Sequence, residues 1–128
     1  MNETIINVGE LYNDSSMNSI LQTASTSFEL ANNSAISMTK TINKPGELYF
    51  PNDVITFTIT ITNHTNSNIR GLFFRDVINE NVNPISGINY LVTTTSGVIS
   101  NTSNPISISG ININANSDVV ITIAGRIV

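Results

Sequence analysis

Residues 53–63 read DVITFTITITN, and this stretch decides the fold class. Four apolar side chains occupy every second position and four threonines lie between them: Ile55, Phe57, Ile59 and Ile61 against Thr56, Thr58, Thr60 and Thr62. Successive side chains of a β-strand point to opposite faces, so the alternation predicts a long strand with one buried face. Most of these residues are β-branched, which favours a strand further.

The same alternation returns at the end of the chain. There the apolar side chains at every second position are Val119, Ile121, Ile123 and Ile127. Shorter strands are predicted at residues 36–42, 47–50, 69–78, 90–94, 97–100 and 106–113, separated by segments rich in Asn, Pro and Gly. No long helical pattern interrupts them. Short strands at close intervals predict an all-β fold, an antiparallel β-sandwich over residues 36–128.

Two glycines predict irregularities within these strands. Gly71 lies inside the predicted strand 69–78 and suggests a bulge or a bend. Gly110 lies inside the strand 106–113, and the isoleucines before and after it occupy opposite phases. We therefore expect Gly110 to be the point at which that strand changes the face it presents to the core.

Residues 1–35 follow a different pattern and are predicted to form an N-terminal arm. Residues 4–11 are expected to be a strand. Residues 17–30 fit either a helical stripe or a strand, and their Ser and Thr content favours extended structure. We expect this arm to dock either on its own domain or on a neighbouring subunit.

Composition excludes several classes of function. Asn, Ser and Thr supply 20, 15 and 15 residues, together 50 of 128, whereas charged residues supply 11% and the net charge is −4. Five scattered cations cannot form a nucleic-acid-binding stripe. The chain has no cysteine, which excludes disulfides and Cys-ligated zinc, and no apolar run is long enough to span a membrane. The start, MNETIINVGE, does not read as a signal peptide, so we expect a mature form or another export route.

Residues 36–128 resemble the conserved surface-repeat family of bacterial and archaeal envelope proteins, known as the domain of unknown function number eleven. The resemblance is carried by ISMTKTINKPGE, by NDVITFTITITN followed by NIRGLFFRDVI, and by NANSDVVITIAGRIV. The chain departs from the pattern at Pro51-Asn52 and at Asn83-Pro84. The resemblance implies an immunoglobulin-like sandwich found on large surface proteins, and therefore a cell-surface, spore-surface or extracellular location.

No catalytic, cofactor-binding or metal-binding set is legible in the sequence, and we do not expect an enzyme. The single histidine, His64, lies in the polar turn NHTNSN and is expected to be solvated. Lys40 shares the phase of the apolar residues of its strand, which points it inward, and a lysine almost never buries without a partner. Candidate partners are Asp76, Asn116 and Asp118, either in an ion pair or in an isopeptide bond. The alternative is a lysine that protects an edge strand.

The leading hypothesis is a structural subunit of a self-assembling extracellular fibre, such as a pilus, a spore appendage or a surface layer. The arm supplies the mechanism of assembly, because a strand from the arm of one subunit can be added to the exposed edge of a neighbour's sheet. The donor-strand residues are predicted to be Thr4, Ile5, Ile6, Val8 and Leu11. The partner is then another copy of the chain. The alternative is a monomeric surface adhesin or carbohydrate-binding module.

Overall fold

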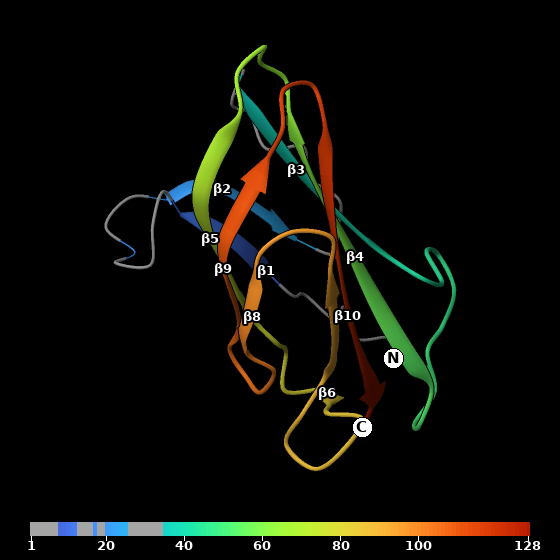
Figure 1. Cartoon of the computed structure of the whole chain (residues 1–128). Helices are drawn as coiled ribbons and strands as arrows, with labels where there is room; N and C mark the ends of the chain where they lie inside the picture. Colours follow the sequence, from blue (N-terminus) through green and yellow to red (C-terminus); the bar gives the residue numbers. More distant parts are fainter. Residues whose placement is uncertain (1–7, 13–16, 18–19, 26–34) are drawn as a thin grey trace.

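The structure is a computed structural model that describes residues 8–12, 17, 20–25 and 35–128 (Figure 1). Every regular element in this part of the chain is a β-strand. The strands are β1 (Val8–Tyr12), β2 (Ile20–Ser25), β3 (Ile36–Ile42), β4 (Val54–Asn63), β5 (Ile69–Val77), β6 (Val82–Asn83), β7 (Leu91–Thr94), β8 (Val98–Asn101), β9 (Ile106–Ile113) and β10 (Asp118–Ile127).

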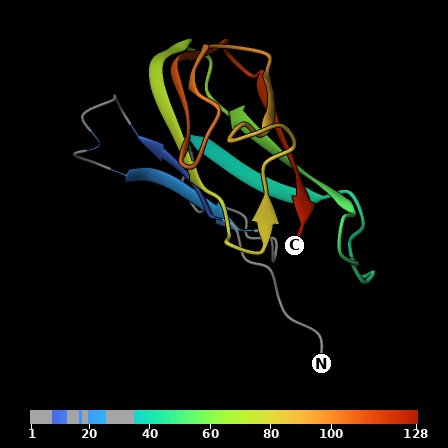
Figure 2. The ribbon, with the colours of Figure 1, turned by 90° about the horizontal axis from the view of Figure 1, so that it is seen from below.

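Two antiparallel sheets pack face to face, which confirms the predicted all-β sandwich. The first sheet has the order β2-β1-β5-β9-β8. The second has the order β3-β4-β10-β6, and β7 also pairs with β10. β2 lies at the end of the first sheet and contacts β3 of the second, so the β1–β2 pair sits at one side of the sandwich (Figure 2).

The core lies between the sheets and follows the alternation seen in the sequence. The inward side chains of β4 are at most 1% exposed: Ile55, Phe57, Ile59 and Ile61. They meet the inward residues of β5, β9 and β10 in one apolar cluster. The threonines of β4 point to the outer face, as predicted, because they occupy the other phase of the strand.

Both glycine irregularities are present. The register of β5 with β9 shifts between Ile69 and Leu72, around Gly71, whose φ is +74°. In β9, Gly110 has a φ of +65° and is exposed, and the isoleucines on both sides of it are buried. A positive φ is easily adopted only by glycine, so this residue lets β9 bury two opposite phases in succession.

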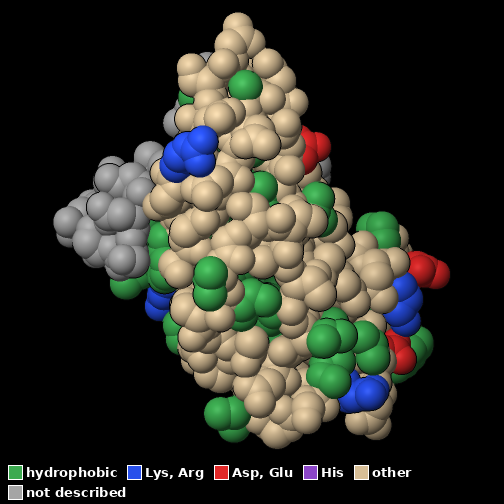
Figure 3. Space-filling model, in the orientation of Figure 1, with side chains coloured by type: hydrophobic (Ala, Val, Ile, Leu, Met, Phe, Trp, Pro, Cys, Tyr) green, Lys and Arg blue, Asp and Glu red, His purple; other side chains and the backbone are tan. Residues whose placement is uncertain are grey.

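On the face shown in Figure 3, charged side chains are few, and most of the surface belongs to uncharged polar side chains or to the backbone. On the outer face of the second sheet, four threonines lie side by side across four strands: Thr41, Thr58, Thr122 and Thr93. The hydroxyls of Thr93 and Thr122 are hydrogen-bonded to each other.

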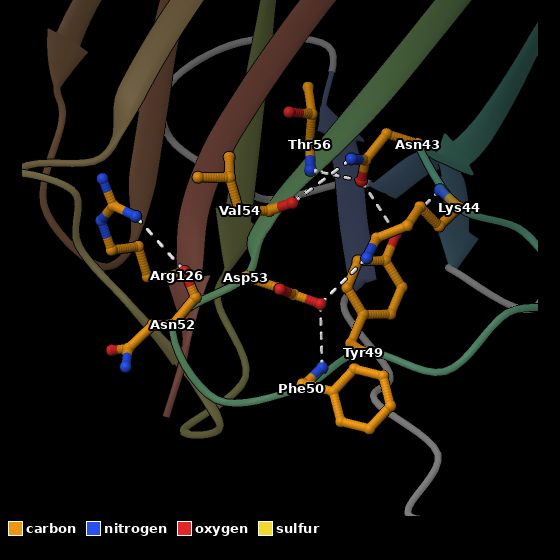
Figure 4. Close-up of polar contacts among 9 residues, drawn as sticks. All are labelled: Asn43, Lys44, Tyr49, Phe50, Asn52, Asp53, Val54, Thr56 and Arg126. Atoms are coloured by element: carbon orange, nitrogen blue, oxygen red, sulfur yellow. Dashed lines mark hydrogen bonds and ion pairs between the residues drawn. The ribbon is translucent and has the colours of Figure 1, made fainter.

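The predicted strand at residues 47–50 is absent, because a side-chain cluster holds this segment as an irregular turn. We call the cluster the Asp53 clasp; it comprises Asn43, Lys44, Tyr49, Phe50 and Asp53 (Figure 4). Asp53 Oδ2 accepts hydrogen bonds from the Phe50 N–H and from Lys44 Nζ, each 2.9 Å long. The Tyr49 hydroxyl donates to Asn43 Oδ1 and accepts from the Lys44 N–H. The backbone N–H groups of Lys44 and Phe50 are thus bonded to side chains and not to a neighbouring strand.

We expect the Asp53 carboxyl to titrate below the usual range of an aspartate. The hydrogen bond from Phe50 and the one from Lys44 both favour the carboxylate and lower the pKa of Asp53. A lowered folded-state pKa means that the clasp stabilises the fold above the ordinary value of about 3.9 and that this contribution is lost as pH falls through the folded-state value. An NMR titration should place the midpoint of Asp53 below that ordinary value, and Lys44→Ala should raise it. A midpoint that does not respond to Lys44→Ala would show that the ion pair is absent in solution.

The arm joins the first sheet through its two described strands, β1 and β2. β1 pairs with β5, and β2 pairs with β1, both antiparallel. β2 also settles the ambiguity at residues 17–30 in favour of extended structure over residues 20–25. In this single chain the arm therefore docks on its own sandwich, one of the two expected alternatives. Leu11 enters the core cluster, so the core draws on residues before position 36 as well.

Candidate functional site

A lysine and an aspartate meet in the buried interior, between the two sheets. Lys40 lies on β3 in the phase of Ile36 and Met38, and Asp76 lies near the end of β5. Both side chains are 0% exposed. Lys40 Nζ lies 2.5 Å from Asp76 Oδ2. Because β3 belongs to the second sheet and β5 to the first, this contact joins the two layers of the sandwich.

The pair lies in apolar surroundings. Lys40 stands opposite Ile59 of β4, and its ammonium group lies 4.9 Å from the centre of the Phe57 ring. Asp76 stands opposite Ile106 of β9 on one side and Gly9 of β1 on the other. Such surroundings weaken the solvation of both charges and strengthen the attraction between them.

Burial lowers the pKa of Lys40, and the charge and hydrogen bond of Asp76 oppose that shift. The pKa of Lys40 is lowered on balance, because loss of hydration penalises an ammonium group strongly in a dry core. An amine and a carboxyl in contact, with water excluded, are the two reactants of amide formation.

The strand β1 covers this pair. A side chain added at Gly9 would place its Cβ 3.0 Å from Phe74 Cε1 and 3.5 Å from Asp76 Oδ2. Only a glycine allows β1 to approach this closely without moving the Phe74 ring. Two residues further along, Leu11 stands opposite Phe74 and is 0% exposed. The N-terminal strand therefore completes both the sheet and the dry enclosure of Lys40 and Asp76.

The structure brings together two of the three predicted isopeptide residues. Asn116 is exposed in the turn before β10, where its side chain donates to Asn66 Oδ1 at 2.9 Å. Lys40 is in register with Ile59 and, through it, with Ile121, five residues beyond Asn116. At about 3.3 Å per residue this is roughly 16 Å along the strand. Asn116 is therefore not a partner of Lys40, and Asp118 is also exposed.

The predicted donor-strand residues are only partly described. Thr4, Ile5 and Ile6 lie outside the described residues. Val8 and Leu11 lie on β1, paired with Val77 and Phe74 of β5. His64 lies in an exposed turn, as expected, and its Nε2 is 2.8 Å from the hydroxyl of Ser37.

Asn63 is a structural residue that the sequence reading left unassigned. Its side chain is 0% exposed, and its amide donates to three carbonyl oxygens, those of Ser67, Ile113 and Asn114. Its carbonyl oxygen accepts from the backbone and the hydroxyl of Thr65. The sequence pattern could have indicated its burial, because Asn63 continues the inward phase of Ile59 and Ile61.

Within residues 8–12, 17, 20–25 and 35–128, no group of three or more His, Asp or Glu side chains could hold a metal ion. In the same part of the chain, no helix is long and apolar enough to cross a membrane.

Comparisons with known proteins found similarity among solved structures and none among family models or curated proteins. No family model matches the chain, so the resemblance to the surface-repeat family stays a prediction. No curated protein matches either. Among solved structures, the crystal structure of the RrgA Jo.In complex is similar, at 12% identity and a TM-score of 0.47. The match covers 71% of this chain and 60% of that one, so the chain spans less than two thirds of the protein it matches.

Proposed function

We propose that the chain is a structural subunit of a self-assembling extracellular fibre, and that subunits join by donating the N-terminal strand to a neighbour. The observation that carries the proposal is the position of β1. This strand comes from the N-terminal arm, yet it lies inside the first sheet, between β2 and β5, with Leu11 fully buried.

The position that β1 occupies beside β5, which we call the seat of β1, can serve as a template for a strand from another chain. Without β1, the backbone of β5 would be an open edge beside an unfilled apolar position at Leu11. Open edges and unfilled apolar positions both favour the addition of a strand. A neighbour's arm carries the same sequence, so it can make the same five residue pairs with β5 that β1 makes in this chain.

Transfer of the arm from each subunit to the next produces a filament. The donor and acceptor surfaces differ, so the contact is head-to-tail and does not close on itself unless the rotation forms a ring. The surface composition supports the proposal, because contacts between neighbours desolvate few charged groups when only 11% of residues are charged.

The direct test is the size of the purified chain in solution. Size-exclusion chromatography and negative-stain electron microscopy should find polymers that grow with concentration. Since few charges are available to screen, raising the ionic strength should change their length little. A chain that stays monomeric at high concentration would overturn the proposal and favour the monomeric adhesin or carbohydrate-binding module.

Leu11→Asp should abolish polymer growth. It would place an unpaired carboxylate in the apolar seat on β5, which a donated strand cannot tolerate. Its own acceptor edge stays intact, so small amounts of this variant added to wild-type subunits should cap filaments and shorten them in micrographs. The matched control is Glu10→Gln, one residue away, where the side chain faces Arg75 at the surface with 22% exposure. Filaments of normal length built from Leu11→Asp subunits would exclude β1 as the donated strand.

A further inference from the structure

The contact between Lys40 and Asp76 is closer than an ordinary ion pair. Charge-assisted N–H···O bonds usually measure about 2.7–2.9 Å, whereas Lys40 Nζ and Asp76 Oδ2 are 2.5 Å apart. The two residues come from different sheets and are 36 positions apart in the sequence. Both are completely buried, whereas the chain's two other ion pairs within the described residues, Lys44–Asp53 and Arg75–Glu10, are partly exposed.

We propose that Lys40 and Asp76 condense to form an isopeptide bond between Nζ of Lys40 and Cγ of Asp76, so that β3 and β5 are covalently joined. The bond would form within one chain. It therefore does not depend on whether the chain polymerises.

The reaction balances within the pair. A proton passes from the ammonium group to the carboxylate, which leaves a neutral amine beside a carboxylic acid. The amine nitrogen attacks Cγ and forms the new N–C bond. One C–O bond then breaks, and the departing hydroxyl takes a proton from the nitrogen and leaves as water. The ammonium and carboxylate thus become one amide and one water molecule, with no oxidant or reductant required.

The surroundings of the pair favour each step. An apolar site favours the neutral amine and acid over the two charges, which supplies the nucleophile and the electrophile together. The lowered pKa of Lys40 acts in the same direction. Packing fixes the two side chains at contact distance, which removes the entropic cost of bringing them together. Gly9 and the strand β1 cover Asp76, so the amide formed is shielded from hydrolysis.

The intact mass of the denatured wild-type chain tests the proposal. We expect a mass about 18 Da below that of the sequence, for the loss of one water molecule. Lys40→Arg keeps the positive charge but removes the amine, so this variant should show its full sequence mass. Lys44→Arg is the matched control at the surface pair with Asp53, and it should keep the loss of water.

A tryptic digest locates the bond. Trypsin cuts after a lysine with a free amine, and the Lys44–Pro45 bond resists it. The unbonded chain should therefore release residues 1–40 and 41–70 separately. The bonded chain should instead give residues 1–70 joined to residues 76–126 as one branched peptide, with fragment ions that place the branch at Lys40 and Asp76.

Two results would overturn the inference. An unshifted wild-type mass would show that the pair is only ionic, whether or not Lys40→Arg folds. A loss of water that maps to another aspartate, as a cyclic imide would, would show that the mass change has a different origin. Both readouts are independent of filament formation, so they stand even if strand donation fails.

Discussion

Asp76→Ala should lower the free energy of unfolding by about 3–5 kcal/mol, because it leaves the Lys40 amine buried in a dry core without its partner. Urea melts followed by circular dichroism would measure the loss. Arg75→Ala is the matched control on the same strand, since Arg75 pairs with Glu10 at the surface. Exposed pairs contribute about 0–1 kcal/mol, so this control should remain close to the wild type. Similar losses in both variants would contradict the burial of the Lys40–Asp76 pair.

The double variant Lys40→Met with Asp76→Leu separates an ionic pair from a covalent one. Replacing both members of a buried ion pair with apolar side chains is often neutral or even stabilising. An isopeptide bond also restricts the unfolded chain, by about 3–5 kcal/mol for loops between 15 and 100 residues, and here it would join residues 36 positions apart. If the bond forms, the double variant should therefore be clearly less stable than the wild type.

Phe57→Ala should lower the free energy of unfolding by about 3–5 kcal/mol, because it opens a cavity in the centre of the core. Phe57 is 0% exposed, and its ring also lies beside the Lys40 ammonium group. The loss is therefore expected to include weaker packing of the ion pair.

Thr58→Ala is the control for Phe57→Ala. Its side chain lies on the outer face of the second sheet, where truncation removes little buried area and the loss should be small. Chemical denaturation of both variants under the same conditions would decide the matter. Equal losses at Phe57 and Thr58 would show that the two faces of β4 are wrongly assigned.

The sandwich was predictable because its longest strands alternate strictly. In β4 and β10 every isoleucine and the phenylalanine of β4 occupy the inward phase, and only one assignment of faces buries them. The segment 47–50 was predicted wrongly for a physical reason. Its apolar residues suggested a strand, but the Asp53 carboxylate accepts a hydrogen bond from the Phe50 N–H and the Tyr49 hydroxyl accepts one from the Lys44 N–H. These two backbone donors are therefore bonded to side chains and not to a neighbouring strand.

The candidate site was predictable in part. The phase of Lys40 placed it inside, and a buried amine requires a counter-charge, which left few partners. The sequence could not choose between Asp76 and Asn116, because that choice depends on which strands of opposite sheets face each other. Sequence alone also gave no reason for Gly9, whose role depends on β1 lying beside the Phe74 ring.

The joint burial of Lys40 and Asp76 constrains how these two positions can diverge. A substitution at either position leaves the other charge buried without its partner. A chain that carries only one of the two substitutions therefore folds poorly. Changes at both restore a compatible core, whether as two apolar residues or as the two charges exchanged between strands. Descendants of this chain should therefore keep the lysine and the acid together or lose them together, and the two columns of a future alignment should vary as one.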